Sequence, residues 1–134
     1  MAVESTLLIV KPDAVRRGLI GEVLRRIEAK GLRLAELRMI TIERVTAEEH
    51  YGEHREKPFF DELVEFIGSG PVVVARVEGE RAVPVLRSLI GSTDPALASP
   101  GTIRGDYGLI ITENLVHGSD SNESADRELK LFFG

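Results

Sequence analysis

The hydrophobic positions of the chain alternate between short apolar runs and stretches with helical spacing. Residues 6–10 form a continuous run rich in β-branched side chains, which is typical of a strand buried on both faces. Apolar residues then recur at helical spacing from Ile20, and Lys30-Gly31 is a typical helix end. Residues 32–42 alternate with two slips of parity. The first third therefore predicts a strand, a helix and a strand with a bulge.

The middle of the chain predicts a pair of helices, a third strand and a further helix. Residues 46–49 have the signature of a capping box, which is expected to begin a short helix. A second helix is expected to begin near Phe59-Phe60. Adjacent helix residues cannot face the same way, so one of these rings should be buried and the other free to contact a ligand. Valines within 71–77 predict a strand, and residues 79–90 predict a helix.

The last third begins with a stretch that has no periodicity. Residues 92–105 predict a loop, and a loop of this length in a compact domain is usually functional. Leu115 and Val116 predict a short last strand, and residues 122–133 a last helix. The element order predicts an α+β fold, a ferredoxin-like βαββαβ arrangement in which helices cover a four-stranded antiparallel sheet.

Length and composition narrow the classes of protein. The 134 residues predict one domain spanning 1–134. The absence of cysteine excludes disulfides, thiolate catalysis and cysteine-based zinc sites. A net charge of −5 disfavours nucleic acid as the primary partner. The apolar run at 7–10 is too short to span a membrane or to form a signal-peptide core, so we expect a cytoplasmic protein with no membrane partner.

Candidate chemistry gathers where the expected strands end. Residues 114–121 read as a strand, a turn and a helix start with His117 at the junction, and helix N-termini attract anions. Lys11 directly follows the first strand, and Arg87 and Arg104 lie near or within the long loop. Three cations meeting in one place would make an anion site in an acidic protein. The sequence has no Walker or Rossmann glycine pattern, so a polyphosphate would need another kind of site.

Two other interpretations compete with a polyphosphate enzyme. Residues 50–54 match the H-x-x-E-H pattern, in which His50 and His54 would hold zinc and Glu53 would be the general base. A module that binds nucleotides without catalysis would need the same anion site but no nucleophile. A Ser-His-Asp triad within 117–120 is disfavoured, because triad side chains converge from separated positions.

Taken together, these segments resemble those of nucleoside diphosphate kinases, and the similarity extends from Thr6 to Phe133. The matching segments are 11–15 (KPDAV) with Arg17-Gly18, Tyr51, 57–60 (KPFF), 69–73 (SGPVV), 100–106 (PGTIRGD) and 114–121 (NLVHGSDS). The last two blocks are highly specific in combination.

The resemblance implies a catalytic cycle. His117 would attack the γ-phosphate of a nucleoside triphosphate, mainly ATP, and the phosphohistidine would then pass its phosphoryl group to nucleoside diphosphates with broad base specificity, in a ping-pong mechanism. Glu128 would hydrogen-bond the far ring nitrogen of His117, and Ser119 would support that pair. Tyr51 would lie near His117 and the transferring phosphate, and Lys11 would also assist the transfer.

The resemblance also implies the nucleotide site, a cofactor and an assembly. Lys11, Arg87, Thr93 and Arg104 would bind the phosphates, Lys11 with Asn114 the ribose 3′-hydroxyl, and Phe59, Leu63 and Ile111 the base. Mg²⁺ would arrive on the nucleotide phosphates without protein ligands. Many members continue beyond the position of Gly134 with a tail that contacts neighbouring subunits. The expected assembly is a homo-oligomer built from dimers, either a hexamer or a tetramer.

Overall fold

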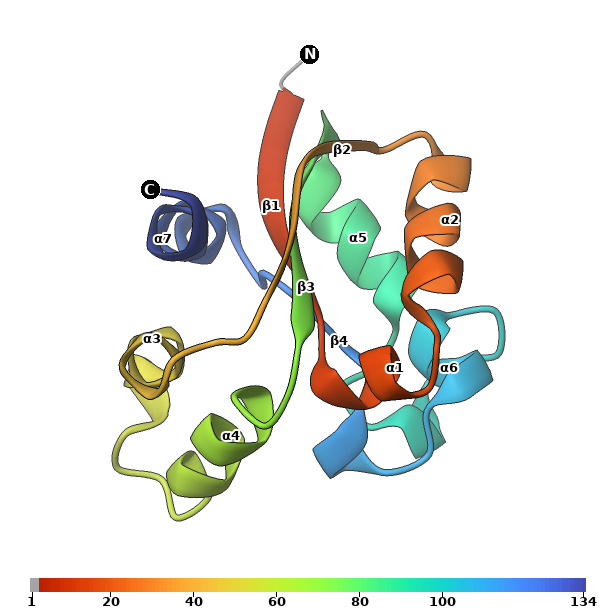
Figure 1. Ribbon diagram of the computed structural model, residues 1–134. Coiled ribbons are helices and arrows are strands. Elements are labelled where there is room, and N and C mark those ends of the chain that lie inside the picture. Colours follow the sequence, from red (N-terminus) through yellow and green to blue (C-terminus); the bar gives the residue numbers. More distant parts are fainter. Residues whose placement is uncertain (1–2) are drawn as a thin grey trace.

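The computed structural model describes residues 3–134 and places a four-stranded antiparallel sheet at the centre (Figure 1). The strands are β1 (Val3–Val10), β2 (Arg33–Ile40), β3 (Val72–Glu80) and β4 (Val116–Gly118), in the order β2-β3-β1-β4. The two central strands carry the most buried runs, because each has a neighbour on both sides. The ferredoxin-like α+β fold predicted from the sequence is confirmed.

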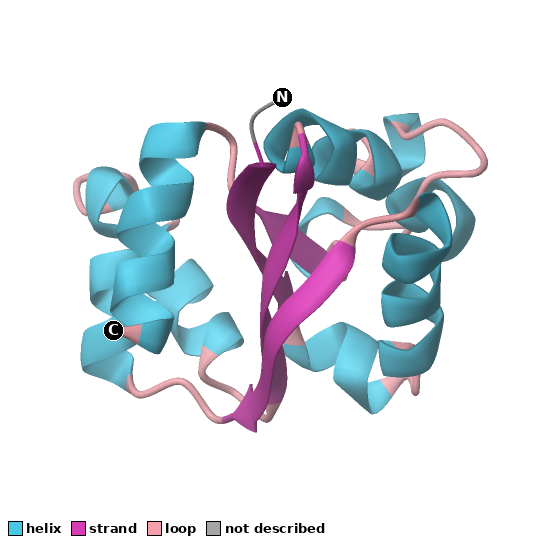
Figure 2. Cartoon of the chain, turned by 90° about the horizontal axis from the view of Figure 1, so that it is seen from above, coloured by secondary structure: helices cyan, strands magenta, loops and turns pink. Residues whose placement is uncertain are grey.

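Helices cover both faces of this sheet (Figure 2). One face packs against α1 (Pro12–Arg16), α2 (Ile20–Lys30), α5 (Ala82–Ile90) and α6 (Ile103–Tyr107), and the other against α3 (Arg44–His50), α4 (Phe60–Ile67) and α7 (Asn122–Phe133). Short 3₁₀ turns lie at Gly52–His54, Pro95–Leu97 and Ile111–Glu113. Alternate side chains of β1 pack into the two hydrophobic cores, Leu8 on one face of the sheet and Leu7 on the other. No helix within residues 3–134 is long and apolar enough to cross a membrane.

Two expected helix starts are wrong. Helix α3 begins at Arg44 with Glu43 as its N-cap, so Thr46 lies inside the helix and forms no capping box. The expected helix over 79–90 begins only at Ala82, because Glu78–Glu80 pair with β1 as the end of β3. Arg81, in a left-handed conformation with φ 55°, makes the turn between them.

The edge strand and the long loop also refine the predictions. The irregular alternation over 32–42 becomes strand β2 with a bulge between Leu34 and Glu36, as predicted. Its edge position leaves Leu37 and Met39 more than half exposed. The expected loop over 92–105 contains a 3₁₀ turn and the start of α6, so most of it is ordered by local backbone hydrogen bonds.

Candidate active site

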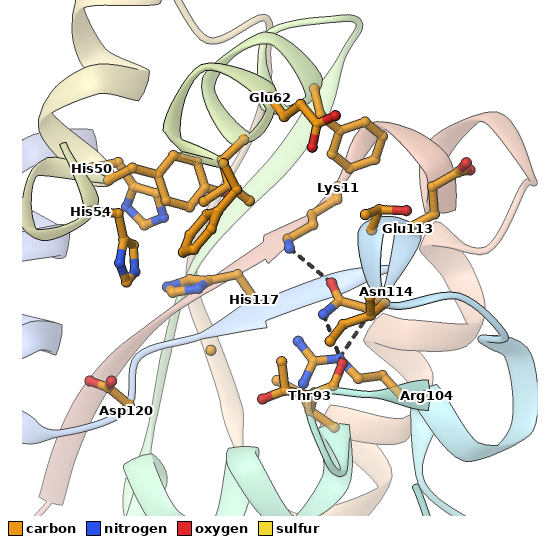
Figure 3. Close-up of a pocket in the computed structure, with 18 of the residues that line it drawn as sticks. Lys11, His50, His54, Glu62, Thr93, Arg104, Glu113, Asn114, His117 and Asp120 are labelled. Carbon is orange, nitrogen blue, oxygen red and sulfur yellow. Dashed lines mark hydrogen bonds between the residues drawn. The ribbon is translucent and has the colours of Figure 1, made fainter. Parts of the chain in front are cut away.

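A cavity of about 800 Å³ lies where β1 and β4 meet the helices (Figure 3). Every site residue expected from the sequence except Ser119 lines it: Lys11, Tyr51, Phe59, Leu63, Arg87, Thr93, Arg104, Ile111, Asn114, His117 and Glu128. Ser119 is fully buried behind the wall. The fold thus gathers residues from segments spread between Lys11 and Glu128 around one space.

The short strand β4 carries His117 into this cavity. His117 pairs with Ile9 in the register of β4 on β1, one position after the buried Val116. The preceding Leu115 has a left-handed backbone with φ 75°, an uncommon conformation for a leucine. The Leu115 N–H donates to the buried Asp13 carboxylate at 3.1 Å, and its carbonyl accepts from the Lys11 N–H at 2.9 Å. These bonds hold the turn that aims His117.

His117 and Glu128 form a close pair. The Nε2 atom of His117 lies 2.8 Å from Oε1 of Glu128, which comes from the second turn of α7. The Ser119 hydroxyl donates to the same oxygen at 2.7 Å and accepts from the Leu7 N–H at 3.3 Å. Ser119 therefore bonds to Glu128 rather than to His117, so no Ser-His-Asp triad forms.

The protonation state of Glu128 determines which ring nitrogen of His117 carries a proton and which has a free lone pair. Burial raises the pKa of Glu128, but hydrogen bonds from His117 and Ser119 outweigh it and lower the pKa to about 2. An ionised carboxylate only accepts hydrogen bonds, so Nε2 of His117 must carry the proton. The neutral ring then has its lone pair on Nδ1. The His117 side chain is 23% exposed, so a ligand in the cavity can reach it.

At the end of α3, His50 packs beside His117, and Tyr51 packs against His50. The His50 ring meets the His117 ring nearly at right angles, with 4.8 Å between centroids. Burial lowers the pKa of His50 to about 3, so this imidazole is neutral near pH 7. Burial likewise raises the pKa of Tyr51 to about 12, which keeps its hydroxyl protonated and able to donate to an anion.

Two hydrogen bonds connect Lys11 through the side chain of Asn114 to the backbone of Thr93. The Lys11 ammonium donates to Oδ1 of Asn114 at 2.9 Å, and Nδ2 of Asn114 donates to the Thr93 carbonyl at 3.0 Å. Burial, followed by the nearby charge of Arg104, lowers the pKa of Lys11 to about 8. This lysine therefore changes charge within the physiological range, and a bound anion would favour its charged form.

Arg104 is more buried and makes more hydrogen bonds than its predicted position in a loop suggested. Its guanidinium is buried and donates to the carbonyls of Gly91, Asn114 and Val116 at 3.1, 3.0 and 2.7 Å. It therefore links the end of α5 to the residues on either side of Leu115. Arg87, by contrast, is exposed, and its one hydrogen bond within residues 3–134 is a long 3.5 Å contact with the Gly118 carbonyl.

The far end of the cavity is apolar and open. Phe59 is 43% exposed, whereas the adjacent Phe60 is 9% exposed and packs in the core, as the helix geometry predicted. Leu63 lies one turn further along α4, and Ile111, which is 54% exposed, comes from a separate 3₁₀ turn. These side chains suit a flat, apolar group rather than a charged one.

Three arrangements differ from the sequence interpretation or were missed by it. The H-x-x-E-H segment is not one helix: α3 ends at His50, and Glu53 and His54 lie in a 3₁₀ turn, with Glu53 3.8 Å from Arg127. The first turn of α7 is capped by the side chain of Ser121, a cap that the sequence interpretation did not identify. The roles of Asp13 and of His50 beside His117 had no sequence signal beyond their neighbours in motifs.

Comparison with known proteins gives the family. The family model described as nucleoside diphosphate kinase matches residues 4–134. The chain is 64% identical over 131 residues to a nucleoside diphosphate kinase of Rubrobacter xylanophilus, covering 98% of both chains. The relative from Archaeoglobus fulgidus is 58% identical, and the match covers 97% of this chain and 86% of that one.

Solved structures agree with this assignment. A halophilic nucleoside diphosphate kinase from Halobacterium salinarum in complex with CDP superposes with a TM-score of 0.96 at 49% identity, covering 98% of this chain and 88% of that one. The enzyme from Aquifex aeolicus gives a TM-score of 0.95 at 45% identity, covering 99% and 96%. The chain therefore belongs to the nucleoside diphosphate kinase family, whose enzymes move the terminal phosphate of a nucleoside triphosphate to a nucleoside diphosphate through a phosphohistidine.

Proposed function

We propose that His117 is the residue that carries the phosphoryl group in this enzyme. Its Nδ1 lone pair attacks the γ-phosphorus in line, the bond from that phosphorus to the β,γ-bridging oxygen breaks, and the diphosphate leaves with the electron pair. A second nucleoside diphosphate reverses the step with its own terminal oxygen. The observation that carries this proposal is the 2.8 Å pair of His117 and the ionised Glu128, which leaves Nδ1 free.

Glu128 and Ser119 position the nucleophile. The Glu128 carboxylate fixes the tautomer of His117 and stabilises positive charge on the ring as the N–P bond forms. Ser119 holds Glu128 in place through its 2.7 Å hydrogen bond. This geometry needs no proton transfer from His117, because the reacting nitrogen carries no proton.

The polar wall of the cavity binds the phosphates and the ribose. Lys11, Arg87 and Arg104 supply positive charge, and Thr93 and Tyr51 supply hydroxyl donors. Asn114 lies within hydrogen-bond distance of Lys11, so the two side chains can bind the 3′-hydroxyl together. Charge and positioning of this kind provide most of the catalysis in phosphoryl transfer.

The apolar end of the cavity binds the base. Phe59 stacks on one face, and Leu63 and Ile111 complete the apolar walls. Stacking does not read the edges of a base, so purine and pyrimidine nucleotides should both be accepted. The complex of the Halobacterium relative with CDP shows that a relative of this fold binds a pyrimidine diphosphate.

Mg²⁺ is the proposed form of the divalent cation that kinases of this family need. Mg²⁺ prefers oxygen ligands and keeps several waters. Within residues 3–134, the one group of three potential metal ligands is His50, His117 and Glu128, a nitrogen-rich set that does not suit Mg²⁺. The ion would therefore be held chiefly by the nucleotide phosphates, where it neutralises charge on the transferring group.

The assembly and location are also proposals. We propose a homo-oligomer, because the edge strand β2 exposes Leu37 and Met39, and Leu97, Leu109 and Ile110 are exposed elsewhere. A hexamer or a tetramer built from dimers agrees with such a surface. The chain would act as a single domain in the cytoplasm.

Intact-protein mass spectrometry after brief incubation with ATP and Mg²⁺ tests the phosphohistidine directly. We expect one added phosphoryl group that maps to His117, is lost in acid, and disappears when GDP or CDP is added. An acid-stable phosphate at another residue, or rapid exchange without a phosphorylated intermediate, would contradict the proposal.

The lowered pKa of Lys11 predicts that the activity of the enzyme depends on pH. Lysine is charged below its pKa, so kcat/KM should fall as the pH rises through about 8, when the free enzyme loses the Lys11 charge. Bound phosphates raise this pKa, so kcat should fall only at higher pH. Steady-state rates measured between acid and alkaline pH check this, and Lys11→Arg should remove the alkaline decline in kcat/KM. An unchanged decline in that variant would assign it to another group.

Phe59 should affect binding of every nucleotide alike. Stacking contributes about 1–3 kcal/mol per base, so Phe59→Ala should raise KM roughly tenfold for purine and pyrimidine diphosphates while kcat stays within about threefold. Phe60→Ala is the matched comparison, because loss of its buried ring should destabilise the fold by about 3 kcal/mol. A KM change confined to one base would show that the site reads base edges.

A further inference from the structure

Two imidazoles in the cavity, those of His50 and His54, have no role in phosphoryl transfer, and His50 is the one beside His117. The chain has three histidines and all three line the cavity. His50 is only 4% exposed, and its Nδ1 has no hydrogen-bond partner within residues 3–134. Buried polar atoms are normally satisfied, so this atom is available to a ligand that enters the cavity.

His50 stands beside two other groups that bind transition metals. His50, His117 and Glu128 each offer one ligand atom, and these atoms lie within 4.8 Å of one another. Two imidazoles that share a tetrahedral ion have ring centroids roughly 5 Å apart, since each metal–nitrogen bond is about 2 Å long. The observed centroid separation of His50 and His117 is 4.8 Å. The two rings are therefore close enough to share one ion once side-chain rotation brings the ligand atoms, now within 4.8 Å of one another, to about 3.3 Å apart.

We propose that His50, His117 and Glu128 form an inhibitory site for a divalent transition-metal ion of the Zn²⁺ type. The ion takes the place of the proton between Nε2 of His117 and Oε1 of Glu128, and these two atoms move from 2.8 Å apart to about 3.3 Å apart, the spacing that a tetrahedral ion with bonds of about 2 Å requires. The displaced proton moves to Nδ1, so the ring stays neutral but its nucleophilic lone pair is lost. A nitrogen of His50 and a water in the cavity complete four-coordination.

The ligand set separates this ion from the one that the reaction needs. Two imidazoles and a carboxylate suit zinc, copper, nickel or cobalt, whereas Mg²⁺ requires oxygen ligands. The cavity carboxylates of Glu53 and Asp120 add negative charge, and Arg104 lies apart from His50 and His117 in Figure 3. The guanidinium of Arg127 lies 3.6 Å from Oε2 of Glu128, the oxygen that the ion does not use. Inhibition rests on the proposed function, because it requires Nδ1 of His117 to be the nucleophile. Metal binding itself does not depend on the proposed function.

Cobalt(II) absorption tests the binding without nucleotide or Mg²⁺. We expect a tetrahedral d–d spectrum that titrates to one ion per chain and is displaced by Zn²⁺. His50→Phe keeps a ring in the same space and should weaken Co²⁺ binding at least tenfold, as should Glu128→Gln, which needs no repacking around His50. His54→Phe, at another cavity histidine, is the matched control and should bind Co²⁺ as the wild type does. An unchanged affinity in His50→Phe and Glu128→Gln would overturn the site.

The inhibition is tested on protein that has been loaded with Zn²⁺ and freed of excess ion by gel filtration. Mixing with ATP and Mg²⁺ should form the phosphoenzyme at least tenfold more slowly than in metal-free protein, and a chelator should restore the rate. His50→Phe should lose this slowing. Undiminished phosphorylation of the Zn²⁺-loaded wild type would overturn the inhibitory role. If metal-free protein is never phosphorylated on His117, the proposed function fails, and the cobalt result stands independently.

Discussion

His117→Gln is expected to lower kcat for phosphoryl transfer by at least about 10⁴-fold, the largest effect of any single substitution in this chain. Glutamine keeps a polar side chain near the size of imidazole and can still donate to Glu128, so the cavity should stay intact. It has no nitrogen lone pair able to attack phosphorus. The variant should therefore bind nucleotide with nearly unchanged affinity and form no phosphoenzyme.

Three measurements together separate loss of the nucleophile from loss of the fold. Nucleotide exchange with ATP and GDP gives the rate, calorimetry with a nucleoside diphosphate gives the affinity, and thermal unfolding gives the stability. The matched control is His54→Gln, since His54 lines the same cavity and packs against Phe59 with 5.6 Å between ring centroids. The control should turn over within about threefold of the wild type. Appreciable exchange by His117→Gln would move the nucleophile elsewhere.

The fold was predictable where local patterns and long-range pairing agree. The run over 6–10 predicted a strand covered on both faces, and residues 6–10 of β1 are indeed fully buried. The prediction failed at Gly79, which looks like a helix start in isolation. In the fold this glycine pairs with Glu4, and a Cβ there would lie 2.6 Å from a methyl group of Leu32. That requirement comes from strand packing and leaves no local pattern.

The site shows the same division between local and long-range information. Eleven of the 22 residues that line the cavity were predicted from the sequence, because they belong to recognisable motifs. The contacts that set the geometry could not be predicted, because they join distant segments. The bond from Leu115 to Asp13 spans 102 positions, and it stabilises a backbone conformation that no motif specifies. Arg104 was expected to bind phosphate, and its three carbonyl contacts depend on where other segments place those oxygens.

These contacts make Arg104 the second position where a large effect is expected. Arg104→Lys keeps a positive charge but removes three donors, two from the buried carbonyls of Asn114 and Val116 and one from the partly buried carbonyl of Gly91. Each hydrogen bond from a charged group contributes about 1.5–3 kcal/mol, and one lysine replaces at most part of the set. We expect the free energy of unfolding to fall by about 3 kcal/mol, measured by urea denaturation. Because Asn114 and Val116 precede His117, kcat/KM should fall about 10²–10³-fold.

Arg87→Lys is the comparison that separates phosphate binding from support of the strand. Arg87 also lines the cavity, but it is exposed, and in the described part of the chain its one hydrogen bond is the long contact with the Gly118 carbonyl. Its substitution should lower kcat/KM about tenfold, through loss of the planar fork, and leave stability within about 0.5 kcal/mol. Equal stability losses in the two variants would mean that the three contacts of Arg104 contribute little. Equal activity losses would mean that Arg104 acts only as a phosphate ligand, and that the position of β4 does not depend on it.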